Sequence, residues 1–411
     1  MRIFAKVLRI WRRNRCEISM KNIALCMKLD DYYEHGIARG VVRYAKQQTD
    51  WRLYGYGWMF RPLADLEYWE GDGIISRVES TADAERLSSL GLPIVDVAGA
   101  YTWAGFHEVN NDDYETGRRA ACYLLSCGFK RFGFCGVRST GWSDKRRQGF
   151  EDAVTGTAQS TAVFEETLPW WERLENSEHL GDWLTGLSFP IGIFACNDTA
   201  GVKLTELCRK LAIPVPDGVA ILGVDNEDIL CELSLPSLSS IELDCYGIGL
   251  RAAGLLDEIL SGEKWEEYRP ILVPPKDLIE RESTLVFATD DPVAKRAVQY
   301  IRSHATEGIN VSDILKVVPA SRRSLENRFK AEIGRTLHDE ITRVRMNHAK
   351  GLLRSTDMIV ATVAAESGFG TLQRFHSIFK KETDMTPAVF RSSVRANAGK
   401  MAQYGRYSSL P

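Results

Sequence analysis

The chain has 411 residues, which is long for one ordinary domain and predicts two or three. No apolar run is long enough to cross a bilayer, which excludes a polytopic membrane protein. The formal net charge is −3, but the charge is distributed unevenly along the chain. From Asp290 onward there are 20 Lys and Arg and 12 Asp and Glu, which gives +8, whereas the preceding part carries −11. A basic C-terminal part on an acidic body indicates a nucleic-acid partner for that part alone.

The nine cysteines are odd in number and scattered, and they form neither a CxxC pair nor a Cys/His metal spacing. This usage is typical of reduced thiols in a cytoplasmic protein, with each cysteine acting as a small buried hydrophobe. We therefore expect no structural disulfide, no metal and no cofactor.

The first 19 residues form a basic leader without the continuous apolar core of a signal peptide. A weak amphipathic helix that touches membrane or nucleic acid is one interpretation. A disordered leader, or translation that starts at Met20, is the interpretation we favour, because a strand begins directly after Met20. The leader is then expected to be dispensable.

From Lys21 onward, predicted strands alternate with predicted helices. The predicted strands cover 23–27, 51–56, 73–76, 93–97, 132–135, 192–196 and 220–224, and the predicted helices cover 33–48, 82–90, 114–127, 144–154, 198–211 and 246–260. Repeated strand–helix units form parallel sheets with helices on both faces. Ligands of such sheets bind at the carboxyl ends of the strands.

Polar and aromatic side chains follow several of these strands. The residues that we single out are Asp30, Trp142, Arg146, Asn197 and Asp225. Sugar recognition uses this mixture, because carboxylates, amides and guanidinium groups bond hydroxyls while aromatic rings lie against C–H faces. Asp and Asn after a strand are also common helix N-caps, so each residue alone has a simpler explanation.

This part of the chain resembles the sugar-binding domain of the LacI/GalR regulators, a two-lobed α/β domain of the periplasmic-binding-protein type I fold. The residues that carry the resemblance are RFGFCG, then RRQGF from Arg146, then ACNDTAGVKLTELCRKLAIPVPDGVAILGVDNED. It covers roughly residues 21–280. The resemblance implies that Arg146, Asn197 and Asp225 hold the effector. That family's DNA-binding headpiece would precede the first strand, where only the leader stands.

Two amphipathic helices near the C-terminus share one design. Helix 321–334 begins at Ser321, a good N-cap, and ends at Gly334, and its apolar stripe is Leu325, Phe329 and Ile333. Helix 371–381 has the stripe Leu372, Phe375 and Phe379. Each follows a short apolar helix, 312–318 or 359–367, and a tight turn, so we predict two helix-turn-helix units. Between them, the inner face of a connecting helix is expected to carry Leu337, Ile341, Val344, His348 and Leu352.

This region, roughly residues 293–395, resembles the DNA-binding domain of the AraC/XylS regulators. The motifs are SRRSLENRFKAEIG, RVRMNHAKGLL and VATVAAESGFGTLQRFHSIFKKETDMTPAVFR. Val317 and Pro319 depart from that family's small residue and glycine turn, which predicts a stiffer turn in the first unit. The resemblance implies base-reading by Arg323, Glu326, Asn327, Gln373, His376 and Ser377, and phosphate contacts by Arg322, Lys330, Arg374 and Lys380.

A LacI-like sensor followed by an AraC-like reader is an uncommon order that resembles the xylose operon regulators. The boundaries we expect are a leader at 1–19, a sensor at 20–280, a linker at 281–291, a reader at 292–396 and a tail at 397–411. The resemblance implies a homodimeric activator of pentose catabolic genes that binds double-stranded DNA, binds D-xylose between the two sensor lobes, and contacts RNA polymerase.

Three other functions stay open at this point. The effector could be another sugar. A glycosidase would need two placed carboxylates, for which Asp30 and Asp225 are candidates, although no catalytic motif appears in the chain. A secreted transport receptor would need a signal peptide and would have no use for helix-turn-helix units.

Overall fold

The computed structural model describes residues 20–47, 50–57, 63–102, 105–156, 161–167, 178–262, 270–285, 289 and 291–398. The leader, most of the tail and positions 286–288 and 290 of the expected linker lie outside them. The chain divides into two compact units. The first contains the chain up to Glu115, Ser139–Lys145 and Leu243–Lys276, and the second contains Thr116–Arg138, Arg146–Glu242 and the chain from Asp277 onward.

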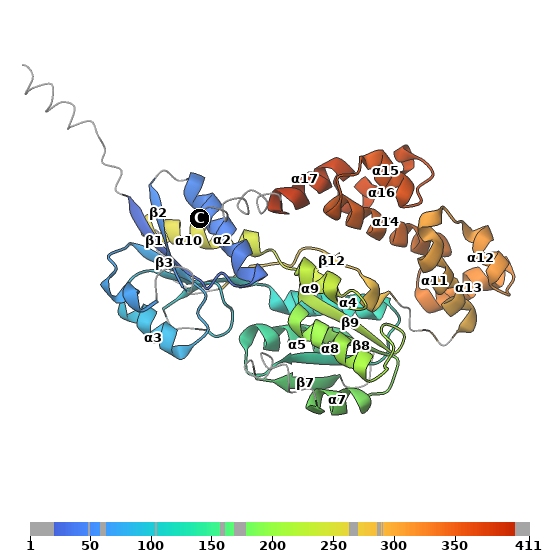
Figure 1. The fold of residues 1–411 in the computed structure, drawn as a ribbon, viewed down its shortest axis with the longest axis horizontal. Helices are drawn as coiled ribbons and strands as arrows, with labels where there is room; N and C mark the ends of the chain where they lie inside the picture. The colour runs from blue at the N-terminus through green and yellow to red at the C-terminus, as the bar shows by residue number, and fades with distance from the viewer. Residues whose placement is uncertain are drawn as a thin grey trace, which may run out of the picture. The chain divides into compact units, whose positions relative to one another are not determined.

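A six-stranded sheet forms the centre of the first unit, in the order β11, β5, β4, β3, β1, β2. Its strands are β1 (Lys21–Cys26), β2 (Trp51–Tyr56), β3 (Gly73–Ser76), β4 (Ile94–Asp96), β5 (His107–Asn111) and β11 (Ile271–Val273). All pairings are parallel, so the carboxyl ends share one edge. Helices α2 (Tyr32–Gln47) and α10 (Cys245–Leu260) pack together beside it, and α3 (Thr81–Ser89) lies on the other side (Figure 1).

A second six-stranded sheet has the order β12, β10, β9, β8, β6, β7. Its strands are β6 (Phe132–Val137), β7 (Ala162–Glu166), β8 (Ile191–Ala195), β9 (Val219–Asp225), β10 (Ser239–Glu242) and β12 (Leu278–Ile279). Only the pairing of β10 with β12 is antiparallel among the described pairings. The helices here are α4 (Asp113–Ser126), α5 (Gly141–Val154), α7 (Glu178–Thr185), α8 (Asp198–Lys210) and α9 (Asp228–Leu233). The predicted parallel α/β sensor is confirmed.

The C-terminal domain is all helical. Its helices are α11 (Pro292–His304), α12 (Val311–Val317), α13 (Arg322–Ile333), α14 (Leu337–Ser355), α15 (Val360–Glu366), α16 (Leu372–Thr383) and α17 (Pro387–Ala398). The pairs α12–α13 and α15–α16 are the two predicted helix-turn-helix units. Ser321 caps α13 by accepting from the Ser324 N–H, and Gly334 ends the helix with a φ of 75°.

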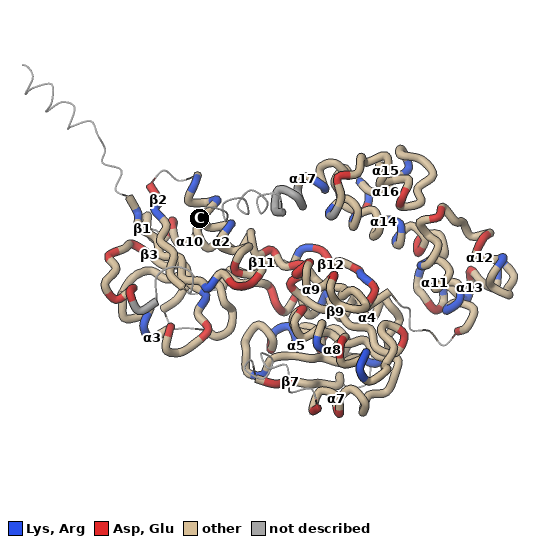
Figure 2. The backbone as a smooth tube through the Cα atoms, viewed as in Figure 1, with Lys and Arg blue, Asp and Glu red and all other residues tan. Residues whose placement is uncertain are grey.

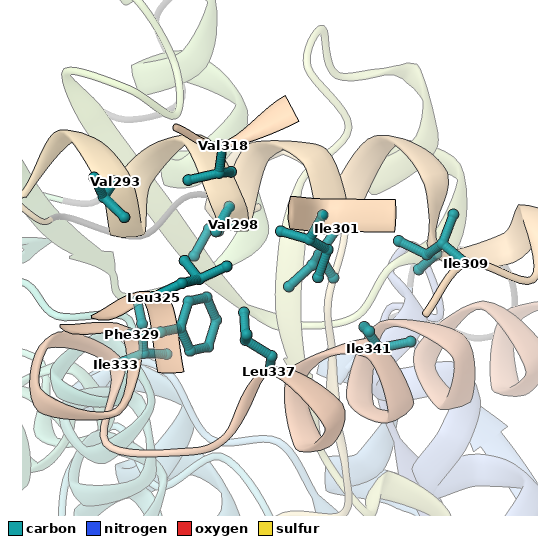
Figure 3. Close-up of a cluster of buried hydrophobic side chains, with 13 residues drawn as sticks. Val293, Val298, Ile301, Ile309, Val318, Leu325, Phe329, Ile333, Leu337 and Ile341 are labelled. Atoms are coloured by element: carbon teal, nitrogen blue, oxygen red, sulfur yellow. The ribbon is translucent and has the colours of Figure 1, made fainter. Parts of the chain in front are cut away.

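Each helix-turn-helix unit has its own hydrophobic core. In the first, the predicted stripe of α13 is buried, and Figure 3 shows the Phe329 ring among Leu325, Ile333 and Leu337. In the second, Phe375 and Phe379 are buried with Phe369 and Phe390. Leu372, predicted for the same stripe, is 43% exposed, so that position was predicted wrongly. Leu372 is the first residue of α16 and precedes the two stripe residues that the second core buries.

The inner face of the connecting helix α14 is the predicted one except at one position. Leu337 and Ile341 are buried as predicted, and Val344 and Leu352 are half-buried and pack against the first and second core. His348 is exposed, and Arg345, Ala349 and Leu353 are buried in addition. A buried arginine needs hydrogen-bond acceptors for its N–H groups. The guanidinium of Arg345 is buried because Nε donates to the Ala305 carbonyl at 2.7 Å and Nη2 to the Ile309 carbonyl at 2.6 Å.

The stretch expected to be a linker begins inside the second unit. Ser283 and Thr284, in a short 3-10 turn (Glu282–Thr284), are fully buried. The Ser283 hydroxyl donates to the Ile221 carbonyl at 2.6 Å, which ties this turn to β9. Among the described residues, no helix is long and apolar enough to span a membrane, and the eight cysteines are free thiols.

Candidate functional site

The carboxyl edge of the second sheet brings two predicted effector residues together. Arg146, on α5, has an Nη1 atom 4.0 Å from Oδ1 of Asp225, the last residue of β9. The same Nη1 donates to the Cys196 carbonyl, which follows β8. The guanidinium is almost fully buried, whereas 28% of the Asp225 side chain is exposed. A fixed fork of donors therefore lies beside a carboxylate that solvent can reach.

The position of Arg146 depends on a close helix contact. Gly117 of α4 faces the backbone of α5, and a Cβ at Gly117 would overlap the Arg146 carbonyl oxygen. A side chain at position 117 would push α5 away. The glycine thus keeps the Arg146 backbone against α4.

Asp225 and Asn226 occupy an unusual turn. Their φ angles are 108° and 52°, in a region that non-glycine residues seldom adopt. Asn226 is held on both sides: its N–H donates to the Ser240 hydroxyl at 3.0 Å, and its side-chain oxygen accepts from Arg281 Nη2 at 2.9 Å. Such a conformation costs free energy and persists only where surrounding hydrogen bonds maintain it, which is common at functional sites.

Asn197 combines a helix cap with its predicted position at the site. It is the N-cap of α8, and its Oδ1 accepts from the Ala200 N–H at 2.9 Å. The simpler explanation of this residue is therefore confirmed for its oxygen. The amide N–H groups of Asn197 are not used by that cap.

The next residue, Asp198, is buried and holds the loop after β9. It accepts from the Ser240 hydroxyl at 2.6 Å and from the Glu227 N–H at 2.8 Å. Burial raises the pKa of Asp198 to about 7, although these bonds act in the opposite direction. Asp198 therefore supports the turn that carries Asp225.

The first unit contains the other two predicted effector residues. Asp30 is exposed after β1, and Trp142 is half-buried at the start of α5. The neighbouring Asp31 is more constrained than Asp30, because it caps the Glu34 N–H at 2.7 Å and accepts from Arg77 at 2.5 Å. Arg77 follows β3 and also pairs with Glu34 and Glu79. This ion network was not predicted, since no local pattern links residues on separate strands.

A buried amide at the carboxyl edge of the first sheet was also missed. Asn110, on β5, is 2% exposed, and neither polar atom of its side chain has a hydrogen-bond partner among the described residues. Leaving such a group unsatisfied costs about 1–3 kcal/mol, so a ligand or water is expected to bond it. Asp96, at the end of β4, is fully buried, and burial raises its pKa to about 7. The polar sequence HEVNN gave no strand signal that would have placed Asn110 at this edge.

The predicted reading positions of the helical domain lie on exposed helix faces. Arg323, Glu326, Asn327 and Lys330 of α13 are exposed, and so are Gln373, Arg374, Ser377 and Lys380 of α16. His376 is half-buried. Figure 2 shows the Lys and Arg positions of α13 in blue. Arg322 and Glu326 form an ion pair of 2.9 Å, which orients both side chains on the first turns of α13.

A charged cluster joins the helical domain to the second sheet within the second unit. Glu280, just after β12, accepts from Arg343 and Asn347 of α14. Arg354, further along α14, pairs with Asp277 at 3.3 Å. Glu340 of α14 is fully buried and lies 2.8 Å from Arg343, 2.7 Å from Arg335 and 4.0 Å from Arg302. Glu280 therefore connects the segment that follows β12 to α14.

Family models match three successive parts of the chain. Residues 22–111 match a XylR N-terminal domain, residues 121–284 a periplasmic binding protein-like domain, and residues 314–393 a helix-turn-helix domain. The chain is 33% identical to the xylose operon regulatory protein of Escherichia coli K12, over 90% of this chain and 96% of that protein. The corresponding protein of Haemophilus influenzae is 31% identical over 90% of this chain and 97% of its own length.

A solved structure of similar organisation covers nearly the whole chain. The structure of the xylose-binding transcription activator XylR superimposes with a TM-score of 0.59 at 32% identity, over 90% of this chain and 98% of that one. The order of sensor and reader, inferred above from separate motifs, therefore occurs as a unit in known proteins.

Proposed function

This chain belongs to the family of the xylose operon regulatory proteins and is a DNA-binding, sugar-responsive transcription regulator rather than an enzyme; we propose that its effector is D-xylose and that it activates pentose catabolic genes. The observation that carries the effector proposal is the pairing of Arg146 with Asp225 at the carboxyl ends of the strands. A carboxylate accepts from two adjacent hydroxyls and a guanidinium donates a fork of N–H groups, so the pair fixes the orientation of a small sugar.

Further effector contacts are proposed within each unit separately. The amide N–H groups of Asn197 donate to a sugar oxygen, since its Oδ1 serves the helix cap. In the first unit, Trp142 offers an aromatic face and Asp30 a carboxylate, as the resemblance implies. Asn110 is added because its buried amide lacks a partner among the described residues.

The two exposed helix faces are proposed to read DNA. Arg323, Glu326 and Asn327 of α13 and Gln373, His376 and Ser377 of α16 face base edges, where Arg suits guanine and Gln suits adenine. Arg322, Lys330, Arg374 and Lys380 contact phosphates and add affinity without sequence preference. Two such helices would enter successive major-groove segments about 34 Å apart.

A route from the effector residues to the reader is proposed through consecutive contacts. Asn226, next to Asp225, accepts from Arg281. Glu280, the neighbour of Arg281 in the chain, accepts from Arg343 and Asn347 of α14. A sugar that binds one conformation of the Asp225 turn more tightly would shift the population of that conformation and so move Glu280 against α14.

The protein is proposed to act as a homodimer in the cytoplasm and to contact RNA polymerase as an activator. Dimerisation would let the sugar change the spacing of two readers on one operator. Light scattering of the full chain with and without D-xylose tests the dimer.

The regulatory proposal is tested on DNA. Duplexes are first selected by the full chain from a random pool, and binding to the best duplex is then titrated with and without D-xylose. We expect sequence-selective binding whose affinity changes with D-xylose. Selection with no response to any pentose would contradict the effector assignment, and no selection at all would contradict the reading helices.

A further inference from the structure

The helical domain contains a basic cavity between its two helix-turn-helix units. It has a volume of about 390 Å³, and its lining includes the side chains of Arg322, Arg345, Arg374 and His338. The remainder of its wall is formed by residues 308–312, the turn residues Gly368 and Gly370, and Ile341. Arg322 belongs to the first turn of α13 and Arg374 to the first turn of α16, so one cavity adjoins the starts of both proposed reading helices.

The cavity holds more positive charge than its surroundings balance. Among the described residues, neither Arg345 nor Arg374 has a carboxylate within 4.0 Å. Arg345 donates to two backbone carbonyls, and Arg374 Nη2 lies 2.8 Å from His338 Nε2. Since a guanidinium can only donate, His338 Nε2 is the acceptor in this contact. The nearby carboxylate of Glu326 is engaged by Arg322.

The guanidinium groups of Arg345 and Arg374, neither of which has a carboxylate partner among the described residues, repel one another. Burial lowers the pKa of Arg345, and the positive charge of Arg374 lowers it further. An anion placed between them would offset this repulsion. Arginine forks match the tetrahedral oxygens of a phosphate, which several donors can bond at once.

We propose that this cavity binds one backbone phosphate of the DNA, in the stretch between the two major-groove segments that α13 and α16 read. The proposal rests on the reading helices of the proposed function and adds to them a shared phosphate site that belongs to neither helix alone. A duplex engaged by both helices carries its backbone past the starts of both, whereas a free anion would reach the cavity without DNA. The site would fix the spacing of the two helix-turn-helix units on the duplex, because Arg345 is held in place on the connecting helix α14.

The test uses the full chain and its selected duplex, in which single phosphates between the two reading segments are replaced one at a time by neutral methylphosphonates. For wild type, we expect one or two adjacent replacements to weaken binding roughly tenfold or more, as loss of a charged hydrogen-bonded contact does. The variant Arg374→Gln should bind the unmodified duplex correspondingly more weakly and be insensitive to those replacements. Arg296→Gln, an exposed arginine of α11 outside the cavity, is the matched control and should stay as sensitive as wild type.

The outcomes separate the cavity from the rest of the reader. If Arg374→Gln keeps the wild-type sensitivity at every position, or if wild type is insensitive throughout, the cavity does not hold a backbone phosphate. If inorganic phosphate titrated into the DNA-free chain binds through Arg374 while no methylphosphonate replacement weakens DNA binding, the site binds a soluble anion and the DNA assignment is overturned. If wild type selects no duplex at all, the reading helices themselves are wrong. Arg345→Gln serves as a second cavity variant, with its fold checked by circular dichroism because Arg345 is buried.

Discussion

Replacing Glu340 by Gln should destabilise the chain strongly, because a buried carboxylate there balances several arginines. Glu340 accepts from Arg343 at 2.8 and 2.9 Å, and Arg335 and Arg302 lie within 4.0 Å. Burial alone would raise its pKa, but the hydrogen bonds and charge of Arg343, with the charges of Arg335 and Arg302, lower it from 4.5 to about 2.

The magnitude follows from that difference in pKa. At about 1.36 kcal/mol for each pKa unit, folding favours the ionised form of Glu340 over its protonated form by about 3 kcal/mol, relative to the unfolded chain. Breaking a buried ion pair from one side costs about 3–5 kcal/mol, because the arginines stay buried without compensation. We therefore expect Glu340→Gln to lower the free energy of unfolding by about 3–5 kcal/mol at pH 7.

The pH dependence has a definite sign. The folded-state pKa lies below the unfolded one, so the stabilisation is full above about pH 4.5 and is lost as the pH falls toward 2. By pH 3.5 the difference in unfolding free energy between wild type and Glu340→Gln should have shrunk by about 1 kcal/mol.

The assay is urea unfolding followed by circular dichroism, together with amide hydrogen exchange along α14, which isolates the reader from the sensor. Glu366→Gln, an exposed carboxylate of α15, is the control and should change little. If Glu340→Gln lowers the free energy of unfolding by less than about 1 kcal/mol at pH 7, the cluster around Glu340 does not stabilise the fold as described. The same holds if the difference in unfolding free energy between wild type and variant stays constant as the pH falls.

Three further predictions concern the reading helices, the proposed route from the effector residues to the reader through Glu280, and the contact of Gly117 with α5 in the sensor. Gln373→Ala should lower discrimination at one base pair by roughly 1–3 kcal/mol, whereas Lys380→Ala should weaken all sequences alike and reduce the salt slope by about one contact; an unchanged site preference for Gln373→Ala in a selection experiment would show that the reading face is misassigned. Glu280→Gln should leave D-xylose affinity near wild type but reduce the response of DNA binding to the sugar, with Glu258→Gln on α10 as control, and a full response would exclude this route. Gly117→Ala should weaken sugar binding at least tenfold by displacing Arg146, in calorimetry on folded protein, and unchanged affinity would mean that α5 adapts without moving Arg146.

The sequence predicted those features that depend on local pattern. The stripe of α13, Phe375 and Phe379 of α16, the cap at Ser321 and the left-handed Gly334 follow from residue types at fixed spacing. Asp225 and Arg146 could be selected because polar residues after parallel strands share one edge of the sheet. Short or polar strands such as β5, and β10 and β12 near the expected linker, carry too few apolar residues to give a signal.

Features that depend on long-range contacts were not predictable. Burial of Arg345 requires two backbone carbonyls about 40 residues away in the chain, and no residue pattern near Arg345 indicates that they will lie beside it. The same holds for Arg77 with Asp31, and for the unsatisfied amide of Asn110, which became visible only when neighbouring strands were placed. Hydrophobic periodicity therefore placed Val344 and Leu352 of α14 correctly against the cores, but it gave His348 to the inner face in error and missed Arg345.

The central claim is that Asp225 and Arg146 hold a pentose, and calorimetry tests it most directly. D-xylose, arabinose, ribose and glucose are titrated into wild type, Asp225→Ala and the control Asp217→Ala, an exposed carboxylate before the opposite end of β9. We predict that D-xylose binds wild type and Asp217→Ala alike, and binds Asp225→Ala about 1–3 kcal/mol more weakly because sugar hydroxyls lose their acceptor. Equal affinities for wild type and Asp225→Ala, or no binding of any pentose to wild type, would contradict this account.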